Sequence, residues 1–588
     1  MAEEKEGQTG TPGTLRRTLL DLAYHPRIPE GAYLTVVSIL VGLATGVGSV
    51  TFIKLLQYTT HFFFETGRGA LTLLGEYYVI LLPAIGGLIV GPLIYRFAQE
   101  AKGHGVPEVM TAMAVKGGRI RKRVAFAKIV TSALTIGSGG SAGREGPMIQ
   151  IGAGIGSTVG QYLKMSDERI KTLVACGAAG GIAATFNAPI AGAMFALEIF
   201  MGQVSLDFSL VILSSVSSAI VSRAMLGDFP SFTVPAYGLL SAKEMPLYLL
   251  LGVLAGLAAV AFVRVLYWFE DRFDSWRFPA YLMPAVGGLL VGVMGVFLPQ
   301  IFGTGFPAIE DALNGRTSLA LLAILIFAKM LATPLTLASG GSGGVFAPAL
   351  FVGAMLGGAY GHIVHGLFPS FTAGAGAYAL VGMGAVFGGA AQAPITAIII
   401  IFEMTGDYRI ILPIMTSTVI SVLIYNVLNK ETIYTLKLVK RGIRFRAGRD
   451  VDVMASIPVR EALTDRFLWL AEEVTVEGFL QRSAEEQHEW FPVLNQSGEL
   501  TGVVTAQDVQ KALDNGDLQA KVGELATKDL ITVTPDNSLH DVLVRFHVRD
   551  LGHLPVVDPD NPKKLVGIIS RSHVIRAYNQ ALISKHLL

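Results

Sequence analysis

A single acidic residue, Glu145, lies in a Gly-rich segment whose composition suits an anion site. The segment Gly139–Pro147 reads GGSAGREGP and precedes an apolar stretch with a helical pattern. Proline is favoured in the first turn of a helix, and the helix N-terminus carries a partial positive charge that attracts anions. A carboxylate there can occupy the place of an anion and leave it on protonation or movement. The alternative is an ordinary N-terminal cap, and the neighbouring Arg144 fits either an ion-pair partner or a structural anchor.

This segment is one of three blocks that occur twice, in the same order. The paired blocks are GGSAGREGP with GGSGGVFAP at Gly340–Pro348, GHGVP at Gly103–Pro107 with GTGFP at Gly303–Pro307, and FNAPIAGAMFALE, ending at Glu198, with AQAPITAIIIIFE, ending at Glu403. Offsets of 200 to 205 residues indicate a duplicated unit, as in transporters whose repeats meet around a site at helix ends. The residue that corresponds to Glu145 is Phe346, and a carboxylate present in one copy at membrane depth favours a functional role.

The repeated blocks offer backbone N–H groups in place of charged side chains. Conduction needs modest binding, and a Lys or Arg side chain in contact with the anion would hold it too tightly for release. The sequence shows no ring of carboxylates suited to metal cations. These observations predict a small anion as the transported ligand and no metal site.

The composition divides the chain into a membrane body and a soluble tail. Of the 588 residues, 52% are hydrophobic and 15% are charged; the charged share is 26% in Arg441–Leu588 and 12% in the preceding 440 residues. Runs that approach the length of a membrane-spanning helix lie at Val36–Leu56, Tyr78–Tyr95, Leu247–Trp268, Leu282–Leu298, Leu319–Leu337 and Ile410–Leu428. We expect Met148–Leu163 and Pro348–Leu367, which Gly and Pro interrupt, to be too short and broken for simple spans.

The same composition excludes several classes of protein. Low charge and high apolar content exclude a disordered chain, a protein that coats nucleic acid and an ordinary soluble enzyme. A net charge of +1 indicates no polyanionic partner. The only cysteine, Cys176, excludes a disulfide scaffold and a cysteine-based zinc cluster.

The segments that flank the membrane body predict its orientation. We assign residues 1–31 to a cytoplasmic N-terminus without a cleavable signal peptide, with an amphipathic helix at Thr14–Tyr24 on the membrane surface. The linker 437–450 carries six basic residues, and the positive-inside rule places it in the cytoplasm. The sequence therefore predicts a multi-pass integral protein of a plasma or inner membrane with both termini cytoplasmic.

The soluble tail is also duplicated. Residues 489–509 (EWFPVLNQSGELTGVVTAQDV) align with residues 552–574 (GHLPVVDPDNPKKLVGIISRSHV). Each copy predicts a strand, a polar turn, a strand and a helix, and a further helix precedes it. We place the two copies at residues 451–515 and 521–582.

Together these motifs resemble the CLC family of chloride channels and chloride/proton antiporters, with a tandem pair of CBS domains in the tail. The resemblance covers essentially the whole chain. It implies an all-α polytopic membrane protein over residues 32–436, built from an inverted internal repeat, followed by an α/β CBS module. It also implies a homodimer with one anion pathway in each subunit.

The resemblance assigns roles to individual residues around a central chloride ion. Glu145 matches the external gating glutamate, and the amides of Val345 and Phe346 match those that hold the anion. Tyr434 matches the tyrosine whose hydroxyl closes the inner side of the site; the alternative is a tyrosine of the interfacial belt.

The inner loop departs from the family pattern. The family has a serine whose hydroxyl touches the anion, whereas this chain has His104, followed by Gly105. His104 either donates an N–H whose charge depends on pH near neutrality, or points away and leaves only backbone amides. In the first case, anion conduction rises at acidic cytosolic pH.

One position separates channels from antiporters in this family. Antiporters usually carry an internal proton-transfer glutamate, and this chain has Ile199 at the matching position. The preceding Glu198 faces about 100° away on a helix, and its repeat partner Glu403 indicates a structural carboxylate. We therefore expect a voltage-gated chloride channel, with a chloride/proton antiporter as the alternative.

CBS domains often bind adenine nucleotides, with a Ser or Thr followed three residues later by Asp at the ribose. The first copy has Thr505 and Asp508, whereas the second has Ser570 and His573. A carboxylate accepts hydrogen bonds from ribose hydroxyls better than a neutral histidine does. We expect at most one site for ATP or another adenine nucleotide, with a purely structural or dimerising pair as the alternative.

A CBS-regulated metal-cation transporter is the alternative from a different class. It would need acidic residues in several spans, and the main candidates are Glu145, Glu198 and Glu403, of which the last two are repeat-related. An enzyme would need a reactive constellation of side chains, but Cys176 lies in an apolar run of Gly and Ala, and the sequence has no Walker-type phosphate loop. We therefore expect no enzymatic activity.

Overall fold

The computed structural model describes residues 30–67, 72–202, 207–228, 230–443, 454, 457–486, 490–548 and 551–584. The chain divides into two compact units, one made largely of the residues up to Lys440 and the other of the tail from Asp450. The expected amphipathic helix at Thr14–Tyr24 and linker residues 444–450 lie outside the described residues.

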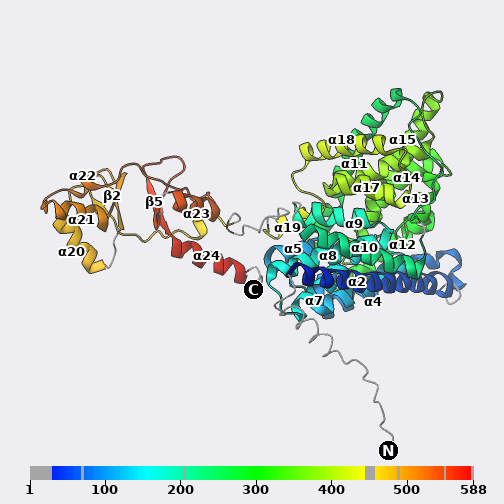
Figure 1. Cartoon of the computed structure of the whole chain (residues 1–588), viewed down its shortest axis with the longest axis horizontal. Coiled ribbons are helices and arrows are strands. Elements are labelled where there is room, and N and C mark those ends of the chain that lie inside the picture. The colour runs from blue at the N-terminus through cyan, green and yellow to red at the C-terminus, as the bar shows by residue number, and fades with distance from the viewer. Residues whose placement is uncertain are drawn as a thin grey trace, which may run out of the picture. The chain divides into compact units, whose positions relative to one another are not determined.

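The first unit is built from helices (Figure 1). Within the described residues, seven helical stretches are long and apolar enough to cross a membrane. Their α-helices are α2 (Glu30–His61), α4 (Leu81–Phe97), α10 (Asp207–Leu226), α11 (Met245–Ser275), α14 (Leu319–Ala338), α15 (Phe346–Leu367) and α18 (Ile411–Leu428). The others are α5 (Val106–Val115), α6 (Lys122–Gly137), α7 (Glu145–Tyr162), α8 (Asp167–Phe186), α9 (Pro189–Ala196), α12 (Met283–Phe297), α13 (Phe306–Leu313), α16 (Ala375–Ala391), α17 (Pro394–Thr405) and α19 (Thr435–Lys440).

The expectation that Pro348–Leu367 is too broken for a span is wrong. Helix α15 runs unbroken for 22 residues, because Pro348 lies in its first turn, where proline is tolerated. Its glycines serve close packing against α16: a Cβ on Gly353 would lie 2.3 Å from the carbonyl oxygen of Gly382. Conversely, the expected span at Leu282–Leu298 forms only the 15-residue α12, since Leu298, which precedes a proline, leaves the helical conformation (φ −134°, ψ 71°).

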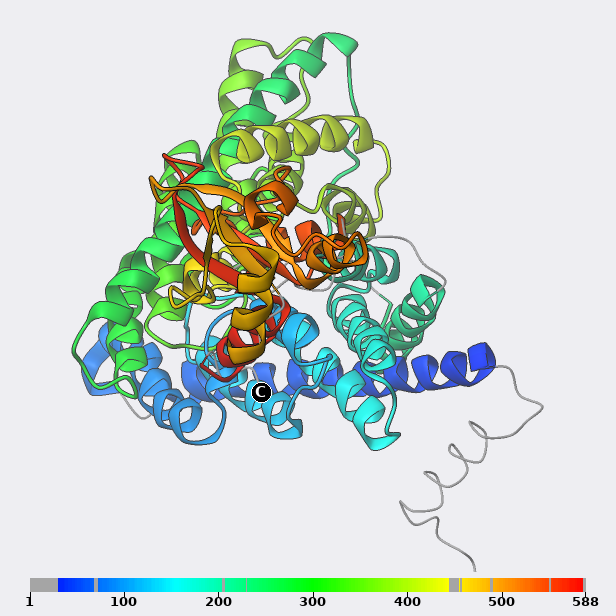
Figure 2. The same cartoon turned by 90° about the vertical axis from the view of Figure 1, so that its left-hand side faces the viewer.

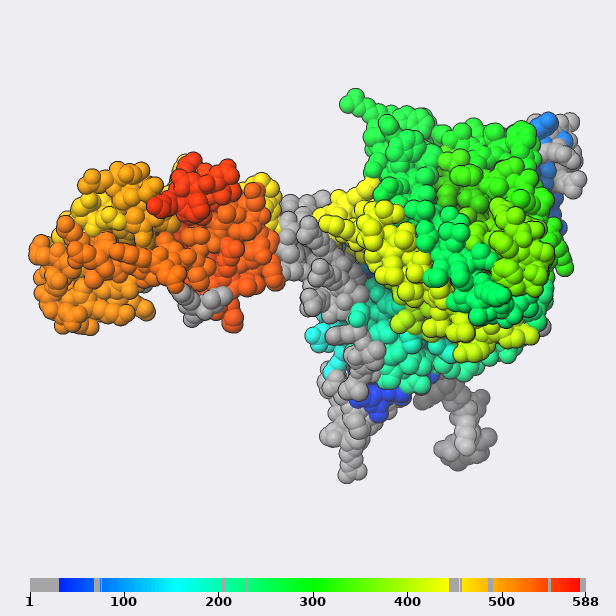
Figure 3. Space-filling model, turned by 90° about the horizontal axis from the view of Figure 1, so that it is seen from above, coloured from blue at the N-terminus to red at the C-terminus, as the bar shows by residue number. Residues whose placement is uncertain are grey.

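The two halves of the first unit contain corresponding helices in the same order. Helices α4 to α10 correspond to α12 to α18, and α4 packs on α12 as α9 packs on α17. Helix α2, blue in Figure 2, lies alongside α6, α8 and α10. In the space-filling view, cyan and green atoms of the first half and green to yellow atoms of the second share one packed body (Figure 3). The duplicated sequence therefore forms a single membrane unit.

Buried hydroxyl groups join the two halves at the repeated GGS segments. The hydroxyls of Ser132 and Ser342 lie 2.8 Å apart. The repeat-related pair, Thr333 and Ser141, has its hydroxyl oxygens 3.4 Å apart. All four side chains are buried. These contacts fix the Gly-rich loop of each half against a helix of the other half, α6 or α14.

The tail forms two β-hairpins, each followed by a helix. Strand β2 (Trp490–Leu494) pairs antiparallel with β3 (Leu500–Thr505), and β4 (His553–Val557) pairs antiparallel with β5 (Leu565–Ser570). The helices that follow are α21 (Ala506–Asp514) and α24 (Arg571–Ser584), and those that precede the hairpins are α20 (Val476–Glu486) and α23 (Leu539–Val548). The predicted order of strands and helices is confirmed.

The first strand differs between the two copies. Strand β1 (Leu470–Ala471) pairs parallel with β2. In the second copy, a single parallel bridge from Val533 to Val556 takes the equivalent place. A short helix, α22 (Val522–Leu525), lies at the start of the second copy.

Candidate functional site

Glu145 begins α7, and its side chain reaches the start of α15 in the other half. Its Oε2 accepts a hydrogen bond from the backbone N–H of Ala347 at 3.2 Å, and the side chain is fully buried. The N–H groups of a first helical turn have no partner within their own helix. The carboxylate therefore lies at a helix N-terminus that attracts anions.

The Gly-rich loops before α7 and α15 hold each other through their backbones. Gly143 and Gly344 exchange two N–H···O bonds, at 2.8 and 2.6 Å. The N–H of Gly343 donates to the carbonyl of Gly103 at 3.3 Å, which ties in the GHGVP loop. A Cβ on Gly344 would lie 2.7 Å from the backbone nitrogen of Gly146, so this close approach requires glycine.

Two buried lysines, Lys128 on α6 and Lys329 on α14, support the loops that contain GHGVP and GTGFP. The Nζ of Lys128 donates to the carbonyls of Ala101 and Gly103 at 3.0 and 2.7 Å. The second lysine donates to the repeat-equivalent carbonyls at 2.9 and 3.0 Å. Both lysines are fully buried. The sequence prediction missed them, although their 201-residue offset, equal to that of the Gly-rich blocks, was the available signal.

His104 lies in the loop that leads into α5. It is 3% exposed, and its ring meets that of Tyr267 edge-on, with the ring centroids 6.4 Å apart. Gly105 has a φ of +79°, and a Cβ there would lie 2.8 Å from the carbonyl oxygen of Gly146. This turn therefore depends on glycine, and it places His104 against the end of α11.

Phe195 connects the residues expected around the central anion. Val345, Phe346 and Tyr434 are each at most 2% exposed. The ring centroid of Phe195 lies 6.4 Å from that of Phe346 and 6.3 Å from that of Tyr434. The sequence prediction did not single out Phe195, although it belongs to the repeated FNAP block. Tyr434 is thus buried among aromatic rings, away from the surface where an interfacial tyrosine would lie.

Glu198 caps the start of α17, which belongs to the other half. It lies in a π-helical turn, Leu197–Met201, that follows α9. Its Oε1 accepts from the N–H of Ile395 at 3.0 Å, and its Oε2 from the N–H of Thr396 at 2.8 Å. Ile199, the next residue, is buried and apolar. This stretch of chain therefore places its carboxylate on a helix terminus.

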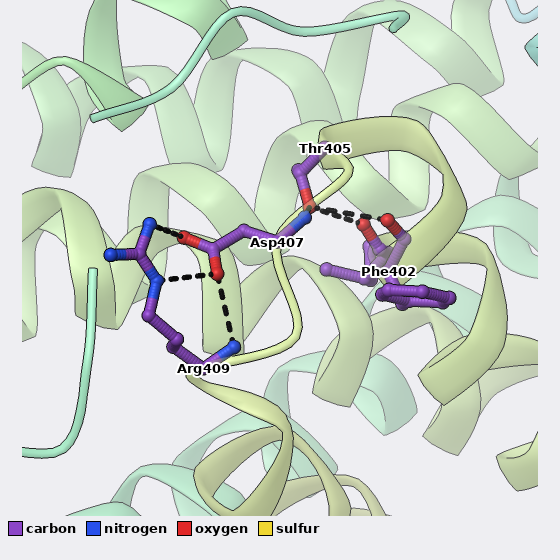
Figure 4. A network of polar contacts seen from close by, with 5 residues as sticks. Phe402, Thr405, Asp407 and Arg409 are labelled. Atoms are coloured by element: carbon purple, nitrogen blue, oxygen red, sulfur yellow. Dashed lines mark hydrogen bonds and ion pairs between the residues drawn. The ribbon is translucent and has the colours of Figure 1, made fainter. Parts of the chain in front are cut away.

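Glu403 makes the reciprocal contact from the end of α17. Its carboxylate accepts from the N–H groups of Ile190 and Ala191 in the first turn of α9, at 3.0 and 2.7 Å. The following turn is braced by Asp407, whose Oδ1 accepts from both the backbone N–H and the Nε of Arg409 at 3.0 Å (Figure 4). Both repeated glutamates thus serve as helix caps, as their repetition indicated.

Arg144 is held as a structural anchor. Its Nη2 donates to the carbonyl of Thr185 at 3.2 Å. Its guanidinium carbon lies 4.9 Å from the centroid of the Phe306 ring, which belongs to the GTGFP block. Of the two alternatives for Arg144, these contacts favour the anchor.

A cleft of about 560 Å³ opens in the tail and is lined by residues of both copies. The rings of Trp490 and His553, which align in the duplication, stack in its wall with centroids 5.3 Å apart. Of the predicted nucleotide-binding residues, Thr505 lines this cleft, whereas Asp508 and Ser570 are not among its lining residues.

The Ser/Thr and Asp/His pairs of the tail form capping boxes at helix starts. The N–H of Thr505 donates to Asp508 Oδ2 at 3.0 Å at the start of α21. At the start of α24, the N–H of Ser570 donates to His573 Nδ1 at 3.4 Å, and the N–H of His573 donates to Ser570 Oγ at 3.3 Å. Burial and the neighbouring Arg576 hold the pKa of His573 below its usual value, which keeps Nδ1 available as an acceptor.

Comparisons with known proteins agree with this architecture. Residues 86–426 match the family described as voltage gated chloride channel, and residues 459–515 and 522–580 match the CBS domain. Chloride channel protein CLC-e of Arabidopsis thaliana is 32% identical over 90% of this chain and 86% of its own length. Chloride channel protein CLC-f of the same plant is 37% identical over 60% of this chain, which spans about half (47%) of that longer protein. The crystal structure of a slow cyanobacterial Cl⁻/H⁺ antiporter superimposes with a TM-score of 0.63 at 28% identity, over 69% of this chain and 97% of that one.

Proposed function

Because this chain belongs to the voltage-gated chloride channel family, we propose that it is a chloride channel in which Glu145 opens and closes the anion pathway. The observation that carries this proposal is the contact of the Glu145 carboxylate with the N–H of Ala347 at 3.2 Å. The carboxylate competes there with an anion for the N-terminus of α15. When it is protonated or swings aside, chloride takes its place.

In the proposed pathway, the central chloride lies between the loop before α15 and the side chain of Tyr434. The N–H groups of Val345 and Phe346 and the Tyr434 hydroxyl donate to it, while His104 and Gly105 line one mouth. Neutral donors stabilise the anion without binding it too tightly for release. The buried lysines donate to backbone carbonyls of the scaffold, so we give them no direct contact with the anion.

A passive channel fits the residues after α9 better than a chloride/proton antiporter does. Ile199 carries no titratable group, and Glu198 is occupied by the N–H groups of Ile395 and Thr396. Coupled exchange is the second candidate, because the cyanobacterial structural neighbour is an antiporter and a relative from Vibrio parahaemolyticus, 36% identical over 64% of this chain, is named an H⁺/Cl⁻ exchange transporter.

The test is the reversal potential of the purified protein in liposomes under a pH gradient. A channel follows the chloride gradient alone, so imposing a pH gradient leaves the potential unchanged. A reversal potential that shifts with the pH gradient would show proton coupling and would favour the antiporter over the channel. A cation flux without chloride flux would favour the metal-cation transporter.

For the tail, we propose regulation by an adenine nucleotide bound in the cleft. The aromatic pair Trp490 and His553 offers a stacking surface for the base, and Thr505 offers a hydroxyl in the same wall. Binding of labelled ATP to the full-length protein tests this, with Trp490→Ala as the variant expected to lose it. If the wild-type protein binds no ATP, a structural or dimerising role of the tail is favoured instead.

We also propose that the protein is a homodimer in a plasma or inner membrane, with both termini in the cytoplasm. The basic residues Lys437, Lys440 and Arg441 support this orientation. Protease cleavage of the tail in sealed vesicles of known sidedness tests the orientation, and crosslinking in liposomes tests the dimer.

A further inference from the structure

The C-terminal end of α11 carries three acidic residues that face basic residues of α19 and of the loop before α5. The three pairs are Glu270 with Lys437 at 3.1 Å, Asp274 with Lys102 at 3.3 Å, and Asp271 with Lys440. Helix α19 also packs against α5, which begins directly after the His104 loop. The end of α11 therefore ties together two segments that belong to the proposed pathway.

The pair of Glu270 and Lys437 is withdrawn from water, unlike its neighbours. The side chains of Glu270 and Lys437 are 15% and 12% exposed, whereas those of Asp271 and Lys440 are 65% and 37% exposed. Exposed charges are screened by solvent and salt. A charge at Glu270 or Lys437 therefore acts over a longer range than one at the outer pair.

This pair lies beside the mouth that contains His104. The Nζ of Lys437 lies 3.2 Å from the position that a Cβ would take on Gly103, the residue before His104. Tyr267, one helical turn before Glu270, packs against His104 and donates its hydroxyl to the carbonyl of Ile433 at 2.8 Å. Ile433 directly precedes Tyr434. The pair of Glu270 and Lys437 therefore adjoins both the loop that contains His104 and the segment that contains Tyr434.

We propose that Lys437 and Glu270 together set the electrostatic potential at the His104 mouth, and hence how readily chloride enters there. Glu270 neutralises Lys437, which keeps the anion affinity of the mouth low enough for rapid exit. Lys437 in turn prevents the carboxylate from repelling chloride. This inference rests on the proposed anion pathway past His104.

The proposal requires the two charges to act in opposite directions. Removing the charge of Glu270 leaves a cation beside the mouth, which concentrates chloride there. Removing the charge of Lys437 leaves an anion, which repels chloride. We expect each change to shift the half-saturating chloride concentration about two- to fivefold, because one unit charge acts across a partly hydrated gap. Ionic strength raised with an impermeant salt should reduce both shifts.

The experiment measures chloride flux against chloride concentration for the full-length protein in liposomes. Glu270→Gln should lower the half-saturating concentration, and Lys437→Gln should raise it. The double variant should return close to wild type, because both charges are gone. Asp271→Asn is the matched control, since it removes a charge from an exposed pair on the same helix end, and it should leave the value unchanged.

A purely structural role gives a different pattern. Both single variants would then lower the flux, neither would shift the half-saturating concentration, and the double variant would not recover; that result overturns the proposal. Lys437→Arg keeps the charge and should behave as wild type, which guards against misfolding of Lys437→Gln. Glu145→Gln in the same assay distinguishes failure of this proposal from failure of the proposed function. The proposed function fails if the wild-type protein carries no chloride flux, or if Glu145→Gln leaves the flux unchanged.

Discussion

Glu198 and Glu403 cap each other's helices across the two halves of the membrane unit. Glu198 follows α9 and Glu403 lies in the last turn of α17, and each carboxylate accepts hydrogen bonds from the first turn of the other helix, at 2.8 and 3.0 Å for Glu198 and at 2.7 and 3.0 Å for Glu403. This reciprocity is possible only if α9 and α17 lie side by side and antiparallel. The two contacts thus express the inverted relation of the repeats.

Removing either capping carboxylate should destabilise the protein. We expect Glu198→Ala and Glu403→Ala each to cost about 2 kcal/mol, because two backbone N–H groups at a partly buried helix start lose their acceptor. Thermal unfolding in detergent measures the loss. Glu310→Ala on α13, for which no side-chain cap is seen, is the comparison variant. Wild-type stability of Glu198→Ala would show that the cap contributes nothing.

Neutralising Glu145 should open the anion pathway. Glu145→Gln keeps the shape of the side chain and removes the charge that competes with chloride at the start of α15. We expect chloride flux to rise severalfold and to lose its dependence on the pH of the side opposite the His104 mouth. The measurement is chloride efflux from liposomes between pH 4.5 and pH 7.5. A flux that keeps the pH profile of wild type would assign the gate to another group.

Lys128 should be required to hold the His104 loop. We expect Lys128→Met to cost about 2 kcal/mol, because the buried carbonyls of Ala101 and Gly103 lose their charged donor and keep only the hydroxyl of Ser342 and the N–H of Gly343. Chloride flux should fall with it, since Gly103 precedes the mouth. Lys122→Met, at the exposed start of the same helix, is the matched control. Equal behaviour of the two variants in unfolding and flux assays would contradict this role.

His104 should make conduction depend on pH at its own side of the membrane. Protonation places a positive charge at the mouth, so chloride flux should rise as that side is acidified through the usual histidine range. His104→Ser removes the titrating group while keeping a small hydrogen-bond donor. The hypothesis fails if wild type and His104→Ser show the same pH dependence in planar bilayers.

The start of α24 should loosen at acidic pH. Since the folded pKa of His573 is below the unfolded value of about 6.5, the folded tail binds fewer protons than the unfolded tail. The stability from this capping box is therefore present above pH 6.5 and is lost as the pH falls through the folded pKa. Amide hydrogen exchange of α24 in the full-length protein, compared at pH 7.5 and pH 5.5, measures it.

Two comparisons control that experiment. His573→Asp should remove the loss of protection, because a carboxylate remains an acceptor at both pH values. Helix α23 begins with the related pair Ser538 and Asp541, and hydrogen bonds from the Ser538 backbone and hydroxyl hold the pKa of Asp541 below its usual range. Protection of α23 should stay constant. If α24 and α23 respond alike, His573 is not the titrating group.

Local patterns in the sequence were sufficient for much of the architecture. The apolar runs predicted most of the long helices, the paired Gly-rich blocks predicted the duplication, and the alternation in the tail predicted both hairpins. The glycines of α15 were misread as breaks, because a helical Gly that interrupts a run and a helical Gly that lets a neighbour approach look the same in one sequence. Only the tertiary contact distinguishes them: a Cβ placed on Gly353 would lie 2.3 Å from the carbonyl oxygen of Gly382.

The residue types at the site were also visible in the sequence: a carboxylate, glycines and a tyrosine in repeated motifs. Which groups they meet was decided by the tertiary structure. Glu145 contacts Ala347, about 200 residues away, and Lys128 bonds to carbonyls of a loop that precedes its own helix. Sequence spacing reports neighbours along one helix, whereas the first of these contacts joins helix ends from opposite halves and the second joins a helix to a loop of its own half. They arise because the packing of the helices places each buried donor and acceptor against a group that is distant in the sequence, in the other half or in another element of the same half.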